Sequence, residues 1–164
     1  MNCKNKPSDD YETQQTNENT CDVELTQEIL SDLYKNVTMA QNAVKTLLPY
    51  VENVNFTKRL HKQVEQYDHY VEQAGTLAKS LNFDPTPAPK AAITMANMGI
   101  KAKMLLDKSR THIAKIMMQG TLNGIIDLYR LSAKDEKAHP EAASLVRQVL
   151  RFEETCLESM KDML

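Results

Sequence analysis

Glycine, proline and aromatic residues are scarce in this sequence of 164 residues, which has four glycines, six prolines and no tryptophan. At average usage of about 7% glycine and 5% proline, a chain of this length would hold roughly 11 and 8. Because these two residues are the strongest breakers of regular structure, their shortage argues against a β-rich chain with many tight turns and favours long helices. The low aromatic content agrees, since strands draw on large and branched side chains.

An excess of one charge is also missing. The formal net charge is −2 at pH 7 with both signs interspersed, which indicates neither a nucleic-acid-binding protein nor an enzyme for acidic substrates. The three cysteines, Cys3, Cys21 and Cys156, form no Cys-x-x-Cys pair, and their odd number excludes a closed disulfide framework. We therefore expect a reduced, cytoplasmic protein. No secretory leader is visible and no apolar run approaches the ~18 residues of a membrane span, so we expect no membrane contact.

The first 22 residues differ in composition from the rest of the chain. They are mostly polar or charged and nearly free of branched apolar side chains. Such a segment cannot bury enough surface to offset the entropy of ordering it. We expect a disordered polar tail over 1–22 and one folded domain, a four-helix bundle, over 23–164.

Apolar residues from Val23 onward recur at steps of three and four, the spacing of one face of a helix. The first stripe should end or bend at Pro49, and the second begins near Phe56, with Asn55 or Thr57 as its N-cap. Pro140 suits the first position of the last helix. The pattern predicts helices from Val23 to about Pro49, and over 56–81, 91–106, 110–133 and from Pro140 onward.

The connection between the second and third long helices is itself long. Three prolines at alternate positions over 85–89 favour an extended connector before the short helix 91–106. About 17 helical residues cover roughly 25 Å, and the proline segment supplies the remainder of a bundle length. The sequence therefore favours a crossover that makes these two long helices parallel. The alternative is that 91–133 forms one long helix, in a helical hairpin with the last.

The paired hairpins and the crossover, with the stretches Thr-His-Ile-Ala at 111–114, Gln-Gly at 119–120 and Gly-Ile-Ile-Asp at 124–127, resemble bacterial ferritin-like four-helix proteins. The similarity covers about 23–164 and is greatest to an uncharacterised group of small ferritin-like domain proteins. It implies an all-α, ferritin-like four-helix bundle with a long crossover, carrying an extra short helix, between helices 2 and 3. Ferritin-like metal enzymes place a Glu on each of two helices and Glu-x-x-His on each of the other two.

This chain departs from that ligand pattern. Its one Glu-x-x-His, 136–139, lies in a connector, and the first helix has Gln41 where a Glu would be needed. A complete di-iron or di-manganese set is absent, so we expect no cofactor. If iron or manganese is bound nonetheless, Glu65, His69 and Glu154 are the candidate ligands, and the role would be in iron or peroxide handling.

Polar side chains interrupt the apolar helix 110–133. Gln119 and Asn123 follow His112 by seven and eleven residues, which places all three on one face of the helix. Buried amides without partners cost roughly 1–3 kcal/mol each, so these groups either bond one another and their neighbours or face a groove. We favour structural pairing over a ligand site. Gly120 and Gly124 favour close helix approach, and a pocket for a planar ligand is the alternative.

The sequence thus favours a binding or structural module rather than an enzyme. We expect self-association through a methionine-rich helix face, with no nucleic acid as a partner. A further alternative is a histidine-phosphotransfer bundle, because His112-x-x-Lys115 matches the start of that motif. Ile116 departs from the motif, where a small residue is expected.

Overall fold

The computed structural model describes residues 21–164, which are mostly helical and contain no strand. The α-helices are α1 (Val23–Leu47), α2 (Val54–Ser80), α3 (Lys90–Leu106), α4 (Arg110–Ser132) and α5 (Pro140–Met160). Short 3₁₀ helices lie between α1 and α2, η1 (Leu48–Tyr50), between α4 and α5, η2 (Asp135–Lys137), and after α5, η3 (Lys161–Met163). The predicted all-α class is therefore confirmed. Most of the predicted tail, 1–20, lies outside the described residues. Asp22, which was assigned to that tail, caps α1 by accepting the backbone N–H of Leu25 at 3.0 Å.

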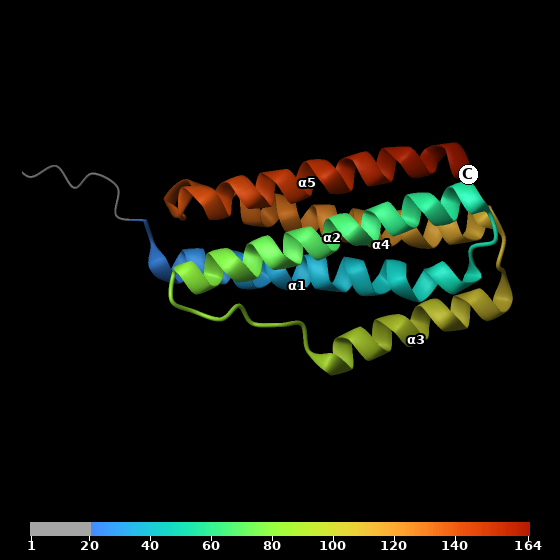
Figure 1. The fold of residues 1–164 in the computed structure, drawn as a ribbon, viewed down its shortest axis with the longest axis horizontal. Helices are drawn as coiled ribbons and strands as arrows, with labels where there is room; N and C mark the ends of the chain where they lie inside the picture. Colours follow the sequence, from blue (N-terminus) through green and yellow to red (C-terminus); the bar gives the residue numbers. More distant parts are fainter. Residues whose placement is uncertain (1–20) are drawn as a thin grey trace, which may run out of the picture.

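Four helices lie side by side as a bundle, and the fifth lies outside it (Figure 1). Helix α1 packs against α2 and α4, and α5 packs against the same two helices, so the bundle is closed. The extended connector after α2 and then α3 run back along the bundle, so that α2 and α4 point in the same direction (Figure 1). The predicted crossover is therefore present.

The alternative of one helix over 91–133 is wrong. Asp107 is extended and ends α3, and the side chain of Ser109 accepts the backbone N–H of His112 at 3.2 Å to begin α4. Helix α3 packs against α1 and has no comparable interface with α4. This break allows α3 to lie apart from α4.

Helix ends follow the local chemistry of the chain. As predicted, α1 ends before Pro49, and Pro140 is the first residue of α5. The predicted cap of α2 is wrong, because Asn53, rather than Asn55 or Thr57, has the extended backbone of a cap. Its side chain accepts the N–H of Phe56 at 2.9 Å, whereas positions 55 and 57 already lie within the helix.

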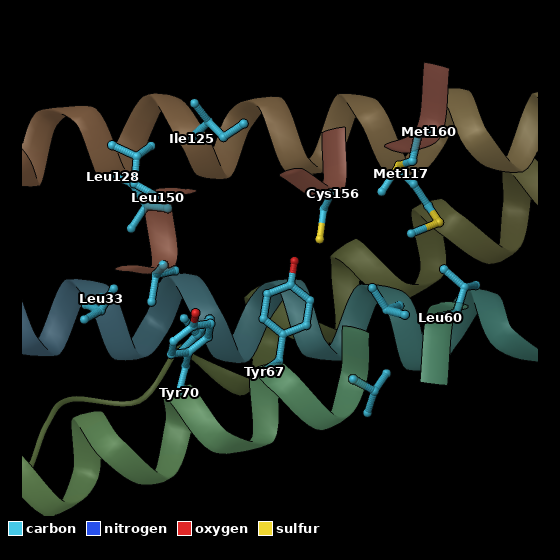
Figure 2. Close-up of a cluster of buried hydrophobic side chains, with 14 of the residues drawn as sticks. Leu33, Leu60, Tyr67, Tyr70, Met117, Ile125, Leu128, Leu150, Cys156 and Met160 are labelled. Carbon is cyan, nitrogen blue, oxygen red and sulfur yellow. The ribbon is translucent and has the colours of Figure 1, made fainter. Parts of the chain in front are cut away.

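The core runs along the bundle axis between α1, α2, α4 and α5 (Figure 2). Fully buried apolar side chains come from each of these helices, among them Ile29, Leu33, Leu60, Leu128 and Val146. None of the described helices combines the length and the apolarity that a membrane crossing requires.

The methionines are divided between the core and the surface. Met104 of α3 and Met117 of α4 are buried, whereas Met95 and Met98 are exposed on the outer face of α3. Self-association through a methionine-rich face stays a prediction.

Candidate functional site

A carboxyl group lies inside the apolar core. Glu153 of α5 is 0% exposed, on the same face of the helix as Val149, Cys156 and Met160. The hydroxyl of Tyr67, on α2, donates to Glu153 Oε1 at 2.7 Å, and Gln63 Nε2 donates to that hydroxyl at 3.2 Å. Figure 2 shows the ring of Tyr67 crossing the core with its hydroxyl pointing toward Cys156 of α5. A polar chain therefore links α2 to α5.

The second oxygen of this carboxyl is left without a partner. Glu153 Oε2 is buried and receives no hydrogen bond from the described residues. Burial raises the pKa of Glu153 to about 7, although the hydrogen bond from Tyr67 opposes the rise. Near neutral pH the group therefore exists in both its protonated and its ionised form.

The two ionisable groups beside Glu153, the Cys156 thiol and the Tyr67 hydroxyl, stay protonated near neutral pH. Burial, followed by the charge of Glu153, raises the pKa of the Cys156 thiol to about 12. The same two causes are the main ones that raise the pKa of Tyr67 well above its usual value. Because the thiolate is the reactive form of cysteine, Cys156 is not poised as a nucleophile.

A cavity of about 790 Å³ adjoins this carboxyl. Its walls come from α1, α3 and α4, and Tyr67 and Glu153 line its inner side. Most of the wall is apolar or small, with Met39, Ala40, Ala43, Ile100, Met117 and Gly120 among the lining residues.

Two features explain why this space is not filled. Small side chains face it, and a Cβ atom added at Gly120 would meet no atom within 4 Å. In addition, α3 packs on α1 without closing onto α4. The cavity is therefore a consequence of the crossover, because the crossover helix α3 rests on α1 and leaves part of α4 uncovered.

The rim of the cavity is polar, and most of its charges are paired. Lys35 bonds Asp32, and Arg130 bonds Asp127, each at 3.0 Å. Asn36 of α1 donates to the carbonyl oxygen of Gly124 at 3.1 Å and so links α1 to α4. Asn36 Oδ1 is buried and, like Glu153 Oε2, has no partner among the described residues.

The structure brings together two of the three polar residues predicted on the fourth helix. Gln119 Nε2 donates to Asn123 Oδ1 at 3.1 Å, so these two amides bond one another, and the preference for structural pairing over a ligand site stays a prediction. Both side chains are exposed and line the cavity, because this part of α4 faces the open space beside α3. His112 lies apart in the first turn, where its Nδ1 is 3.8 Å from Asp107 Oδ2. Its Nε2 is buried without a described partner, so the geometry does not favour phosphotransfer through it.

The metal-ligand candidates do not form a cluster. Glu65 and His69 are exposed on α2, and Glu154 is exposed on α5, where it accepts a hydrogen bond from the Tyr129 hydroxyl. No group of three or more His, Cys, Asp or Glu side chains within residues 21–164 is placed to hold a metal ion. Of the Glu-x-x-His pair, His139 accepts the N–H of Glu141 as the cap of α5.

Sequence reasoning named Glu154 and missed Glu153 and its contact with Tyr67. The signal for Glu153 was its position, four residues after Val149 and three before Cys156, on the apolar face of α5. Tyr67 likewise lies within the apolar stripe of α2.

No protein-family model, curated protein or solved structure matches this chain.

Proposed function

We propose that this chain is a ferritin-like four-helix bundle that binds a small, largely apolar molecule in the cavity between α1, α3 and α4. The ferritin-like assignment is supported by two antiparallel hairpins, α1–α2 and α4–α5, joined by a crossover that makes α2 and α4 parallel. Glu153 is the one buried carboxyl group among the described residues, which accords with the incomplete di-iron ligand set of the sequence.

The cavity, with the Glu153 carboxyl and its one unpartnered oxygen on the inner side, carries this proposal. Ligand sites are concave spaces of about 300–1,000 Å³ with mainly apolar walls and a few placed polar groups. The cavity of about 790 Å³ has this size, and Glu153, Tyr67 and Asn36 supply the polar groups. Binding is favoured over catalysis because the nearby thiol and phenol are held in their protonated forms.

Two helix glycines provide a matched test of the cavity. A Cβ atom at Gly120 or at Gly99 would meet no atom within 4 Å, but Gly120 lines the cavity and Gly99 does not. Leucine at either position should raise helix propensity by up to ~0.8 kcal/mol. Only Gly120→Leu places a large side chain in the cavity.

The measurement is the titration of each protein with N-phenyl-1-naphthylamine, a neutral probe that becomes fluorescent in apolar surroundings. We expect saturable binding to the unmodified protein and to Gly99→Leu, and binding at least about tenfold weaker to Gly120→Leu. Circular dichroism checks that both variants remain helical. Equal binding by both variants, or no saturable binding to the unmodified protein, would contradict the proposal.

A further inference from the structure

The polar atoms of the cavity differ in what they offer a ligand. Two residues that line the cavity, Glu153 and Asn36, each have one buried side-chain oxygen without a partner among the described residues, and both oxygens, Glu153 Oε2 and Asn36 Oδ1, are hydrogen-bond acceptors. The hydroxyl hydrogen of Tyr67 is already directed to Glu153 Oε1. A ligand that satisfies this wall must therefore bring donors.

The charges around the cavity point the same way. Lys35, Arg130 and Lys134 line it, and each is bonded to a carboxylate oxygen at 3.0 Å, Lys35 being half-buried and the other two exposed. Lys103 of α3 also lines the cavity, is exposed and forms no ion pair within residues 21–164. At Glu153 itself, the interactions that act on its charge are burial and the hydrogen bond from Tyr67, with no cation among them. A buried carboxylate without a positive partner is costly, and a cation supplied by a ligand would remove that cost.

Other ligand classes fit this wall less well. A carboxylate or phosphate would place its charge against two acceptor oxygens, one of them ionisable. A wholly apolar ligand would leave both oxygens without partners, and a neutral alcohol would satisfy one of them without supplying a charge.

We infer that the ligand is an apolar amine whose ammonium group donates to Glu153 Oε2 while its apolar body lies along Met39, Ala43, Met117 and Gly120. The inference rests on the proposed function, because it assigns the ligand class of the same cavity. Asn36 Oδ1 provides a second acceptor in the wall for a ligand N–H.

A matched ligand series separates the amine from its apolar body. Butylbenzene, 4-phenylbutan-1-ol, 4-phenylbutylamine and 4-phenylbutanoate share one body and differ in the head group. Each is used at pH 8 to displace N-phenyl-1-naphthylamine from the full chain. Because a hydrogen bond to a charged group exceeds a neutral one, we expect the amine to bind about tenfold more tightly than the alcohol, and the carboxylate most weakly.

Two adjacent carboxyl residues provide the variant and its control. Glu153→Gln keeps an acceptor for Tyr67 but removes the charge, and should reduce the preference for amine over alcohol to below about threefold. Glu154→Gln, on the exposed side of α5, should leave the preference unchanged.

Lowering the pH repeats the test without a substitution. As the pH falls from 8 to 5.5, Glu153 becomes protonated and loses its charge. The affinity for the amine should therefore fall, while the affinity for the alcohol stays constant. Tyr67 from α2 and Cys156 from α5 face Glu153, and both stay protonated over this range. The other charged side chains at the cavity are the half-buried pair Asp32–Lys35 of α1, the exposed pair Asp127–Arg130 of α4, the exposed Lys103 of α3, and Lys134, which is paired with Glu28.

The outcomes are distinguishable. Equal affinity for amine and alcohol in the unmodified protein, or an amine preference that survives both Glu153→Gln and pH 5.5, would overturn the amine inference and leave the apolar cavity intact. Failure of the probe and of every ligand to bind would overturn the proposed function itself.

Discussion

At the scale of single residues, the Glu153 carboxyl makes the stability of the bundle depend on pH. Its pKa rises from an ordinary value of 4.5 to about 7, because burial disfavours the charged form. The folded state therefore binds the proton more tightly than the unfolded state between these values. The stability that the protonated group contributes is fully present below about pH 4.5 and is lost as the pH rises through about 7. The shift corresponds to about 3 kcal/mol.

We predict that Glu153→Gln increases the free energy of unfolding at pH 8 by about 2–3 kcal/mol, because an amide does not ionise. The gain should shrink toward pH 4.5, where the carboxyl of the unmodified protein is also neutral. Urea denaturation at pH 4.5, 6 and 8 measures this difference. The exposed Glu154→Gln should stay within about 0.5 kcal/mol of the unmodified protein at each pH. If Glu153→Gln destabilises the protein equally at all three pH values, the ionised carboxylate is a structural requirement and the prediction is wrong.

The burial of Glu153 could not be predicted from its residue type. Glutamate is almost never fully buried, so residue type alone predicts that both glutamates at 153 and 154 are exposed. The helical period places only Glu153 on the apolar face of α5. Its carboxyl is tolerated there because it accepts a hydrogen bond from Tyr67, which is 86 residues away in the sequence. A side chain of α2 thus decides the role of a residue on α5.

At the scale of an element, the cap of α2 distinguishes two nearby asparagines. Asn53 accepts the N–H of Phe56 at 2.9 Å, and its loss should leave that donor unsatisfied within the protein. We predict that Asn53→Ala lowers the free energy of unfolding by about 1 kcal/mol. Asn55→Ala, inside the first turn of α2, should be neutral or slightly stabilising, because alanine is the better helix former. Urea denaturation of the two variants tests the assignment, and a larger loss for Asn55→Ala would reverse it.

Breaks in the helices were predictable where stereochemistry forces them. Proline cannot donate a hydrogen bond, which explains why α1 ends before Pro49 and α5 starts at Pro140. The start of α2 was harder, because asparagine and threonine at 53, 55 and 57 all suit a cap. The choice depends on backbone angles in the turn after η1, which composition does not specify.

At the scale of the whole molecule, chain lengths predicted the crossover, whereas the cavity could not be predicted. The proline connector and α3 together span the bundle, so the sequence indicated that α2 and α4 run in parallel. The cavity instead depends on how three helices pack, because α3 rests on α1 and leaves space beside α4. Gly120 and Gly124 were visible in the sequence, but which face of α4 stays uncovered is a property of the assembled bundle.

The same arrangement predicts that α3 is the least stable helix. Met104 is its one buried residue, and its main interface is with α1, whereas α5 buries residues along its length against two helices. Helices with few buried contacts open locally at a lower free energy than the core. We expect amide hydrogens of 90–106 to exchange earlier than those of α1 and α5, as measured by hydrogen exchange with mass spectrometry. Met104→Ala should speed exchange in α3 further without affecting α5, whereas Met98→Ala, at an exposed position of the same helix, should not. If α3 is protected as strongly as α5, it belongs to the cooperative core, and the wall that it gives the cavity is as rigid as the bundle itself.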